Sequence, residues 1–319
     1  MRRVLVTGGA GFIGSTFIRR LLAADPGTHV INLDLLTYAG VRVTVDELNA
    51  LDRHEFVHGD VRDRTLVDSL VAASDAVVHF AAESHVDRSI SGPEVFLSTN
   101  VVGTGVLLDA AVRHGLSRFV HVSTDEVYGS ISSGAAAETD PLRPSSPYAA
   151  SKAAADLLAD AYGTTYGYKA IITRCTNNYG PYQHPEKLIP LAITRLLAGG
   201  RIPIYGDGSQ ERDWLWVDDH CAALQLLLDE GKPGETYNIG ADAQAKNRDV
   251  ADSLIEIVGS GAVEHVDDRP GHDHRYAIDS SKLRNLGWRP TVGLEAGLER
   301  TVAWYRERRD WWEPLVAEA

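Results

Sequence analysis

The chain has 319 residues, of which 44% are hydrophobic and 24% are charged, and its formal net charge is −13. This length and balance are typical of a globular protein with one large domain or two modest ones. The acidic balance argues against a nucleic-acid surface or an anionic membrane as a partner. The two cysteines, Cys175 and Cys221, lie far apart without metal-ligand spacing. We therefore expect a reducing compartment, no disulfide framework and no metal site.

The N-terminal residues enter a strand pattern within three positions, with no signal-peptide core and cleavage site. No apolar run is evident that is long enough to span a bilayer. The sequence therefore predicts a cytoplasmic protein.

Short apolar runs alternate with helical patterns through the first half of the chain. Strands are predicted at residues 4–9, 29–34, 55–60, 76–82, 118–124 and 169–175, and helices at 11–24, 64–73, 94–114 and 146–166. Buried strands that alternate with helices indicate a parallel sheet covered on both faces. Because crossovers are right-handed, we expect an α/β, Rossmann-type, doubly wound fold.

After about residue 180 the pattern changes, because Pro and Gly occur in clusters. Helices are still predicted at 187–199, 217–230, 247–258 and 293–308. We expect residues 1–180 to form the sheet domain, to which later segments return. Residues 181–319 are expected to form mainly a smaller C-terminal lobe that binds the substrate.

Three glycines, Gly8, Gly11 and Gly14, follow the first strand and open the first helix. This spacing favours a tight turn whose backbone approaches a pyrophosphate at the helix N-terminus. Asp34 ends the second strand, twenty residues after Gly14, where an acid binds an adenosine ribose. The pattern predicts NAD rather than NADP, because the acid would repel a 2′-phosphate. A simple glycine turn with an incidental acid is the weaker alternative.

Asp60 and Val61 end the third strand. By the same topology they would flank the adenine of the cofactor. An equally good interpretation is that Asp60 is the N-cap of the next helix.

Tyr148 and Lys152 share one face of a predicted helix, at positions i and i+4. A free phenol has a pKa of about 10, and a nearby ammonium together with a positive nicotinamide ring would lower it. A surface Tyr packed on a Lys stem is the alternative for this pair alone. With the glycine turn upstream and Thr124 at a strand end, the pair indicates catalysis on an alcohol or ketone.

In this order and spacing, the glycine turn, Asp34, Thr124 and the Tyr148–Lys152 pair resemble the extended short-chain dehydrogenase/reductase superfamily. The resemblance implies a Rossmann domain and a smaller C-terminal substrate lobe. Chemistry on a ketone or alcohol does not need Asp125 and Glu126, which follow Thr124. Adjacent acids push each other's pKa apart, so one donates a proton while the other accepts one. Such a pair suits the loss of water next to a ketone.

The string Thr124–Gly129 resembles the signature of the dTDP-glucose 4,6-dehydratases. Further matching strings are residues 34–40, 79–89, 174–181, 185–190, 205–208, 212–214 and 268–272. The resemblance implies NAD as cofactor and dTDP-glucose as substrate. It also implies a homodimer formed by the helices at 94–114 and 146–166, which sequence alone does not distinguish from an ordinary core face.

The resemblance implies a role for each catalytic position. Tyr148 is the base at the C4 hydroxyl of the sugar, and Lys152 tunes it. Thr124 hydrogen-bonds the C4 oxygen as it becomes a ketone. Glu126 removes the C5 proton, and Asp125 protonates the departing C6 hydroxyl.

Two binding sets follow from the same resemblance. Expected at the cofactor are Gly8, Gly11, Phe12, Ile13, Gly14, Asp34, Thr37, Asp60, Val61, Ala81, Ala82, Ser84, Thr99, Tyr148, Lys152 and Asn178. Expected at the substrate are His85, Thr124, Asn177, Lys187, Leu188, Pro203, Tyr205, Arg212, Asn247, Arg269 and His272. Tyr205 would stack on the base, and the cations would bind the pyrophosphate. Solvated surface charge is the alternative for each cation.

The sequence departs from the pattern at two places that are not catalytic. Val41 and Arg42 follow Gly40, and Ala241 and Gln244 lie in the segment before Asn247. UDP-glucose therefore stays an alternative substrate. A sugar-nucleotide 4-epimerase would not need the acid pair, and a decarboxylase would need a site for a C6 carboxylate. A non-catalytic NAD sensor would be expected to lack one of the catalytic residues, all of which are present.

Overall fold

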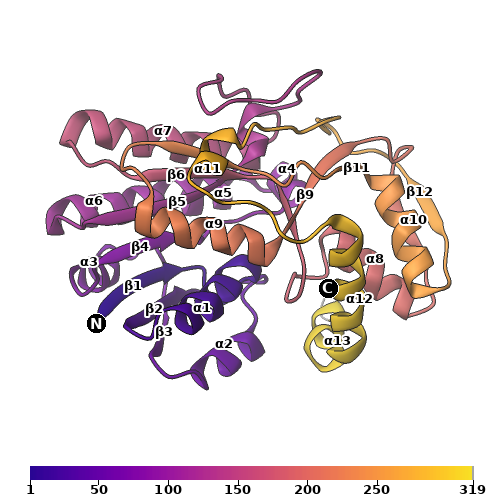
Figure 1. The fold of residues 1–319 in the computed structure, drawn as a ribbon, viewed down its shortest axis with the longest axis horizontal. Helices are drawn as coiled ribbons and strands as arrows, with labels where there is room; N and C mark the ends of the chain where they lie inside the picture. Colours follow the sequence, from indigo (N-terminus) through magenta and orange to yellow (C-terminus); the bar gives the residue numbers. More distant parts are fainter. Residues whose placement is uncertain (318–319) are drawn as a thin grey trace.

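The computed structural model describes residues 1–317 and consists of a large parallel sheet flanked by helices and a smaller lobe beside it (Figure 1). The seven strands run in the order β10-β6-β5-β4-β1-β2-β3, and every neighbouring pair is parallel. Their bounds are β1 Arg2–Thr7, β2 Thr28–Asp34, β3 His54–His58, β4 Ala76–His79, β5 Arg118–Thr124, β6 Ile171–Cys175 and β10 Thr236–Ile239. The predicted Rossmann-type fold is confirmed.

Alternate side chains of each strand enter different cores, as expected for a sheet buried on both faces. Val4 and Val6 pack with the helices α1 and α9, whereas Leu5 packs with α3, α6 and α7 on the other face. These helices span α1 Phe12–Ala24, α9 Val217–Glu230, α3 Arg64–Ala72, α6 Thr104–His114 and α7 Pro147–Tyr166. The continuous apolar strand sequences follow from this double burial.

The second half of the chain returns to the sheet. Strand β10 pairs with β6, and α9 packs against α1. The helix at 217–230 has the predicted bounds, but the strand at 236–239 was not predicted. Four residues beside a Gly/Pro-rich loop carry too little pattern to distinguish a strand from a loop.

The helix predicted at 94–114 is one helical span of three parts. They are α5 Pro93–Phe96, a π-helical segment η1 Leu97–Gly103, and α6. By length and composition alone, the span Pro93–His114 is sufficient to cross a membrane, which corrects the expectation from sequence. Half of its most apolar stretch is buried, and it packs against α3 and α7 as a layer helix of the sheet.

The smaller lobe, on the right in Figure 1, has its own aromatic core. Its strands are β7 Asn177–Tyr179, β8 Ile202–Tyr205, β9 Glu211–Trp216, β11 Gln244–Lys246 and β12 Val263–Val266. The main helices are α8 Leu188–Leu197, α10 Asn247–Val258, α12 Leu294–Glu307 and α13 Arg309–Ala317. The predicted helices are present, but the short strands and α13 were not predicted. Short helices also occur as α2 Arg42–Asn49, α4 Val86–Ser91 and α11 Ser281–Asn285.

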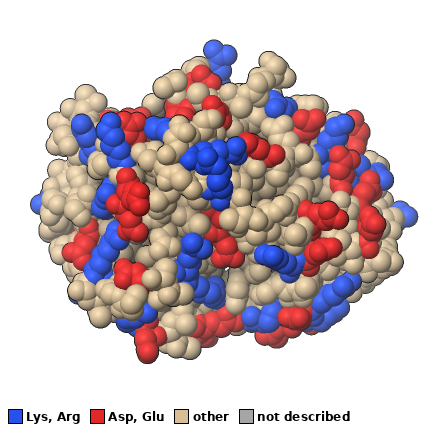
Figure 2. All heavy atoms as spheres, in the orientation of Figure 1, with Lys and Arg blue, Asp and Glu red and all other residues tan. Residues whose placement is uncertain are grey.

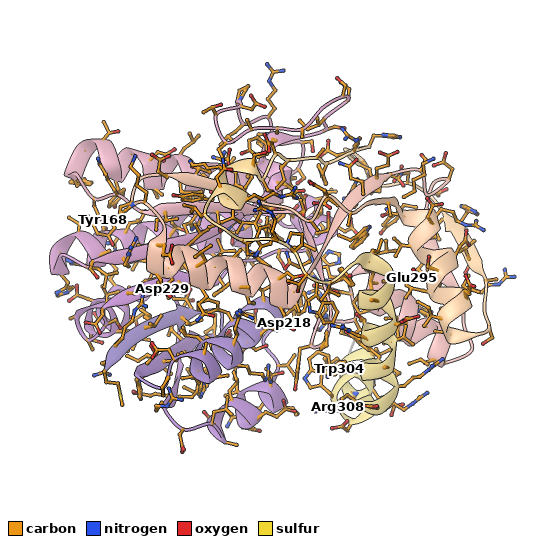
Figure 3. The ribbon with its side chains drawn as sticks, viewed as in Figure 1. Tyr168, Asp218, Asp229, Glu295, Trp304 and Arg308 are labelled. Carbon is orange, nitrogen blue, oxygen red and sulfur yellow. The ribbon has the colours of Figure 1, made fainter. Side chains whose placement is uncertain are left out.

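Helix α2 connects the two lobes. Glu47 accepts hydrogen bonds from Arg308 at 2.6 Å, from Arg19 at 2.9 Å and from the Tyr182 hydroxyl at 2.8 Å. Arg308 and Trp304 lie at the end of α12 that is near α13 (Figure 3). Val41 is buried within the core of the smaller lobe. The departure from the family pattern after Gly40 therefore places an apolar anchor and a short helix against the C-terminal helices.

Candidate active site

A cavity of about 350 Å³ opens at the carboxyl ends of the sheet strands, where the smaller lobe meets the sheet. All sixteen predicted cofactor residues line it. Of the predicted substrate residues, Thr124, Asn177 and Lys187 also line it. Ligands of doubly wound folds bind at this edge of the sheet. The sequence motifs thus meet in one cavity.

The glycine turn between β1 and α1 has no room for side chains at two positions. Gly8 has a φ of +73°, and a Cβ on it would lie 2.6 Å from the backbone nitrogen of Ala81. A Cβ on Gly14 would lie 2.3 Å from the carbonyl oxygen of Gly8. Gly11 is the N-cap of α1 and makes no side-chain hydrogen bond to the first turn of the helix. The turn is therefore an open cradle for a phosphate.

Asp34 joins this cradle to the loop after β2. Its carboxylate accepts hydrogen bonds from the backbone N–H of Ala10 at 2.9 Å and of Leu36 at 2.8 Å. Burial raises the pKa of Asp34, and the two backbone donors oppose that rise. Each carboxylate oxygen retains a lone pair for a ribose hydroxyl. The glycine cradle and Asp34 therefore fit NAD.

Asp60 is not the N-cap of α3, so that alternative is wrong. Asp63 caps α3 by accepting from the backbone N–H of Thr65 and Leu66. Asp60 instead pairs with Arg62 at 2.5 Å and lines the cavity beside Val61. The Arg62 hydrogen bond lowers the pKa of Asp60.

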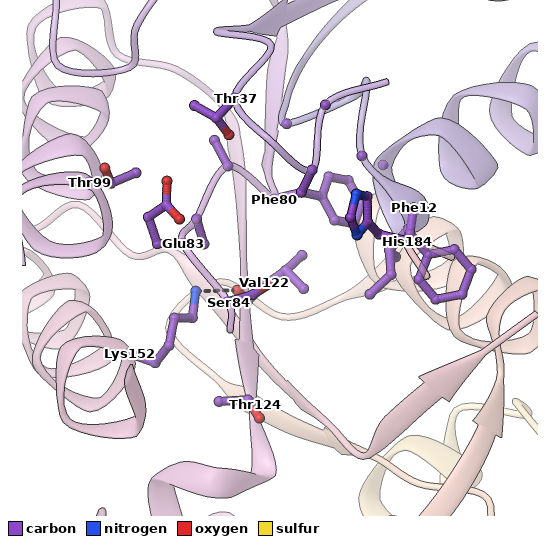
Figure 4. Close-up of a pocket in the computed structure, with 18 of the residues that line it drawn as sticks. Phe12, Thr37, Phe80, Glu83, Ser84, Thr99, Val122, Thr124, Lys152 and His184 are labelled. Atoms are coloured by element: carbon purple, nitrogen blue, oxygen red, sulfur yellow. Dashed lines mark hydrogen bonds between the residues drawn. The ribbon is translucent and has the colours of Figure 1, made fainter. Parts of the chain in front are cut away.

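Lys152 points at the sheet rather than at Tyr148. Its ammonium donates to the carbonyl of Val122 at 2.7 Å, as the dashed line in Figure 4 shows. Burial lowers the pKa of Lys152 to about 8. Burial and the Glu126 charge raise the pKa of Tyr148, and a hydrogen bond with Thr124 opposes this. The pKa of the Tyr148 phenol is therefore raised rather than lowered, so Lys152 alone does not produce the expected lowering. The positive nicotinamide ring is the other group from which that lowering was expected.

The two acids follow β5 in the short 3₁₀ helix η2 Asp125–Tyr128. Burial, the Glu126 charge and the Asp213 charge raise the pKa of Asp125 well above its usual value. Thr124 lies 3.2 Å from one carboxylate oxygen of Asp125, and the other oxygen is buried without a partner in the structure. This environment favours the protonated form of Asp125.

Glu126 has a different environment. Burial raises its pKa, but Arg212, Arg269 and Lys187 each lower it. These cations come from the smaller lobe, whereas the acid comes from the sheet domain. On the face drawn in Figure 2, Lys and Arg are interspersed with Asp and Glu. The three cations favour the ionised form of Glu126.

The rest of the predicted substrate set lies outside the cavity lining. These residues are His85, Leu188, Pro203, Tyr205, Arg212, Asn247, Arg269 and His272. Asp87 connects two of them, because it accepts from the Tyr205 hydroxyl at 2.9 Å and pairs with Arg269 at 3.1 Å. His272 pairs with Asp268 at 2.6 Å, and its ring lies edge-on to Tyr205. The phenol of Tyr205 and the Arg269 guanidinium thus share one carboxylate partner.

Several residues that line the cavity were not predicted. Glu83 lies near Thr99 and Lys152 in Figure 4, and Arg62, His184 and Glu186 also line the cavity. Each lies within a few residues of a predicted position, which is the only signal that sequence offered. Within residues 1–317, no group of His, Cys, Asp and Glu is arranged to hold a metal ion.

The parallel sheet, the phosphate cradle and the cavity define an NAD-dependent enzyme with a short-chain dehydrogenase/reductase fold. The GDP-mannose 4,6 dehydratase family model matches residues 5–301. A dTDP-glucose 4,6-dehydratase from Streptomyces niveus is 53% identical and covers 98% of this chain and 95% of that protein. The low-salt glycan biosynthesis protein Agl12 of Haloferax volcanii is also 53% identical, and the match covers 95% of this chain and 98% of that protein.

The crystal structure of DesIV, a dTDP-glucose 4,6-dehydratase from Streptomyces venezuelae, contains NAD and dTDP. It superposes with a TM-score of 0.96 at 56% identity, covering 98% of this chain and 99% of that one. The chain belongs to the dTDP-glucose 4,6-dehydratase family.

Substitution of Gly8 by Ala is expected to weaken NAD binding about tenfold or more. The added Cβ collides with backbone atoms of Ala81, and the positive φ strains any L side chain by ~1–3 kcal/mol. Titration of NAD into the variant measures the loss. Gly293→Ala is the matched control, because a Cβ there meets nothing within 4 Å. Unchanged affinity in Gly8→Ala would contradict the assignment of the cradle.

Proposed function

We propose that the protein converts dTDP-glucose to dTDP-4-keto-6-deoxyglucose, with the catalytic work divided among Thr124, Asp125, Glu126, Tyr148 and Lys152. The observation that carries the proposal is the unequal environment of the two acids. Burial and two neighbouring acids raise the pKa of Asp125 well above its usual value, with one cation, Arg212, opposing the rise, which favours its protonated form. Burial also raises the pKa of Glu126, but three cations oppose that rise and favour its ionised form. One acid and one base at adjacent positions suit the elimination of water.

When bound, NAD accepts a hydride from C4 of the sugar and later returns it to C6. Tyr148 takes the proton of the C4 hydroxyl, and the Thr124 hydroxyl beside it holds the oxygen as it becomes a ketone. The ketone makes the C5 proton acidic, and ionised Glu126 removes it. Asp125 gives its proton to the C6 hydroxyl, which leaves as water. When the hydride adds at C6, Glu126 returns its proton to C5. The cycle consumes no external reductant, because the hydride that leaves C4 ends at C6.

The cationic residues of the smaller lobe are proposed to bind the nucleotide diphosphate. Lys187 lines the cavity and donates to the carbonyl of Ser84 at 2.9 Å, so it lies at the junction of the two lobes. Arg212 and Arg269 act on Glu126 from the same side. Charge-assisted hydrogen bonds to a pyrophosphate would use these donors. A 4-epimerase would share this binding but would have no use for the proton transfers of Asp125 and Glu126.

A purified sample given dTDP-glucose and no added reductant is expected to release a product that is lighter by one water. Mass spectrometry of the nucleotide sugar measures it, with UDP-glucose in a parallel reaction. Faster turnover of UDP-glucose would move the assignment to that substrate. A folded, NAD-loaded sample that only inverts C4, or leaves both sugars unchanged, would refute the dehydratase assignment.

The variant Glu126→Gln is expected to oxidise C4 but to slow elimination by about a hundredfold or more, because the general base is lost. The absorbance of enzyme-bound reduced nicotinamide should then accumulate during the reaction. Glu264→Gln is the control, since Glu264 is exposed on β12. Elimination at the parental rate would show that Glu126 is not the base.

We further propose a cytoplasmic homodimer. Both cysteines are free thiols, which suits a reducing compartment. The adjacent helices η1 and α7 expose large apolar side chains, with Leu97 and Val102 each 52% exposed and Leu157 59% exposed. Paired helices with exposed apolar residues suit a two-fold interface.

Leu157→Glu is expected to convert the dimer to a monomer, because the interface would then bury a charge. Size-exclusion chromatography with light scattering gives the mass. Leu286→Glu is the control, since Leu286 follows α11 and lies outside these helices. A dimer that persists in Leu157→Glu would place the interface elsewhere.

A further inference from the structure

Helix α7 carries a second ionisable residue that the proposed mechanism does not use. Asp156 follows Lys152 by four residues, so both side chains lie on one face of the helix. Both are buried, and Asp156 is fully so. Its carboxylate accepts a hydrogen bond from Arg174 on β6 at 2.9 Å. The other carboxylate oxygen lies 3.3 Å from Nε2 of His121 on β5, without hydrogen-bond alignment.

Lys152 and Asp156 contact consecutive residues of strand β5. The ammonium of Lys152 donates to the carbonyl of Val122, and Asp156 lies against His121, the residue before it. A buried ammonium is unfavourable unless an opposite charge or hydrogen bonds compensate it. The Val122 carbonyl supplies a hydrogen bond but no charge. The helix therefore places a carboxylate one turn away from an ammonium that needs a counter-charge.

We propose that Asp156 is a positioning residue that acts through Lys152, as the buried counter-charge that keeps this ammonium charged beside the cofactor. The inference rests on the proposed function, since it assigns a partner to Lys152, one of the proposed catalytic residues. Arg174 holds Asp156 in place from the adjacent strand. The three side chains are buried where α7 packs against the sheet.

Other ionisable groups around Lys152 are unsuited to this task. Burial lowers the pKa of His79 on β4 and of His121 on β5, so both rings are neutral. Burial raises the pKa of Cys175 on β6 to about 12 and that of Tyr148 well above its usual value, so neither is an anion. A neutral imidazole, thiol or phenol offers no charge to balance the ammonium.

Asp156 itself stays ionised. Burial raises its pKa, but the hydrogen-bonded guanidinium of Arg174 opposes that rise, and the net direction is down. Its charge raises the pKa of Lys152 against the effect of burial. The acids of η2, Asp125 and Glu126, act on Tyr148 instead. Loss of the Asp156 charge would therefore lower the pKa of Lys152, and the ammonium would be lost at a lower pH.

The variant Asp156→Asn is expected to move the alkaline limb of the pH dependence of turnover to lower pH, by about one unit or more. Turnover of dTDP-glucose by the NAD-loaded protein is measured between about pH 6 and about pH 10. Asp156→Glu restores the charge and should return the limb toward the parental position. Asp160→Asn is the matched control, because Asp160 is exposed one turn further along α7.

The outcomes separate this inference from the proposed function. A parent protein that does not turn over dTDP-glucose refutes the function. A parent that does, with an unchanged alkaline limb in Asp156→Asn, overturns the role of Asp156. Lower activity at every pH with an unchanged limb also overturns it, because a purely structural role has that result. NAD content and melting temperature report whether each variant folds.

Asp156→Asn leaves the Arg174 guanidinium without its counter-charge, which destabilises a buried site. If that variant does not fold, Asp156→Asn with Arg174→Gln replaces the buried pair by two neutral amides. The alkaline limb of this double variant is also expected to move down, since the partner of Lys152 is lost. A parental limb in the double variant overturns the inference.

Discussion

Two adjacent carboxylates at the end of one strand, Asp125 buried and Glu126 partly buried, are the constraint on which this site depends. Asp125 and Glu126 are adjacent in sequence, and burial raises the pKa of both. Left alone, the pair would hold its protons and could not act as a base. Cations from the smaller lobe make the two acids differ, because Arg212, Arg269 and Lys187 all lower the pKa of Glu126, whereas of the three only Arg212 acts on Asp125. The lobes must therefore be held together for the two acids to differ.

The connection between the lobes meets this requirement. Glu47 on α2 binds Arg19, Arg308 and Tyr182, and thereby ties the first helix of the sheet domain to the C-terminal helices. Trp311 adds an indole N–H donated to Thr44 at 2.9 Å. The same helix follows the loop that lines the adenosine side of the cavity. The sheet domain and the smaller lobe are thus joined through α2.

Lys152, which also lines the cavity, carries a buried charge that needs compensation in the same way. Lys152 is buried, and its ammonium donates a hydrogen bond to the carbonyl of Val122, while the proposed counter-charge is Asp156, one turn along the same helix. The Glu126 carboxylate and the Lys152 ammonium therefore each interact with groups from another element. A parallel sheet suits this arrangement because strands distant in sequence end side by side.

The sequence by itself determined the order of most strands and helices in the sheet domain, the glycine turn and Asp34, and it suggested the candidate catalytic residues. Their signals are local, because strand burial, turn geometry and helical spacing extend over a few residues. Only the tertiary structure decided that β10 completes the sheet, that Asp63 rather than Asp60 caps α3, and that Lys152 contacts Val122. It alone brought Arg212, Arg269 and Lys187 to Glu126. These features depend on contacts between distant segments, and no local pattern encodes such contacts.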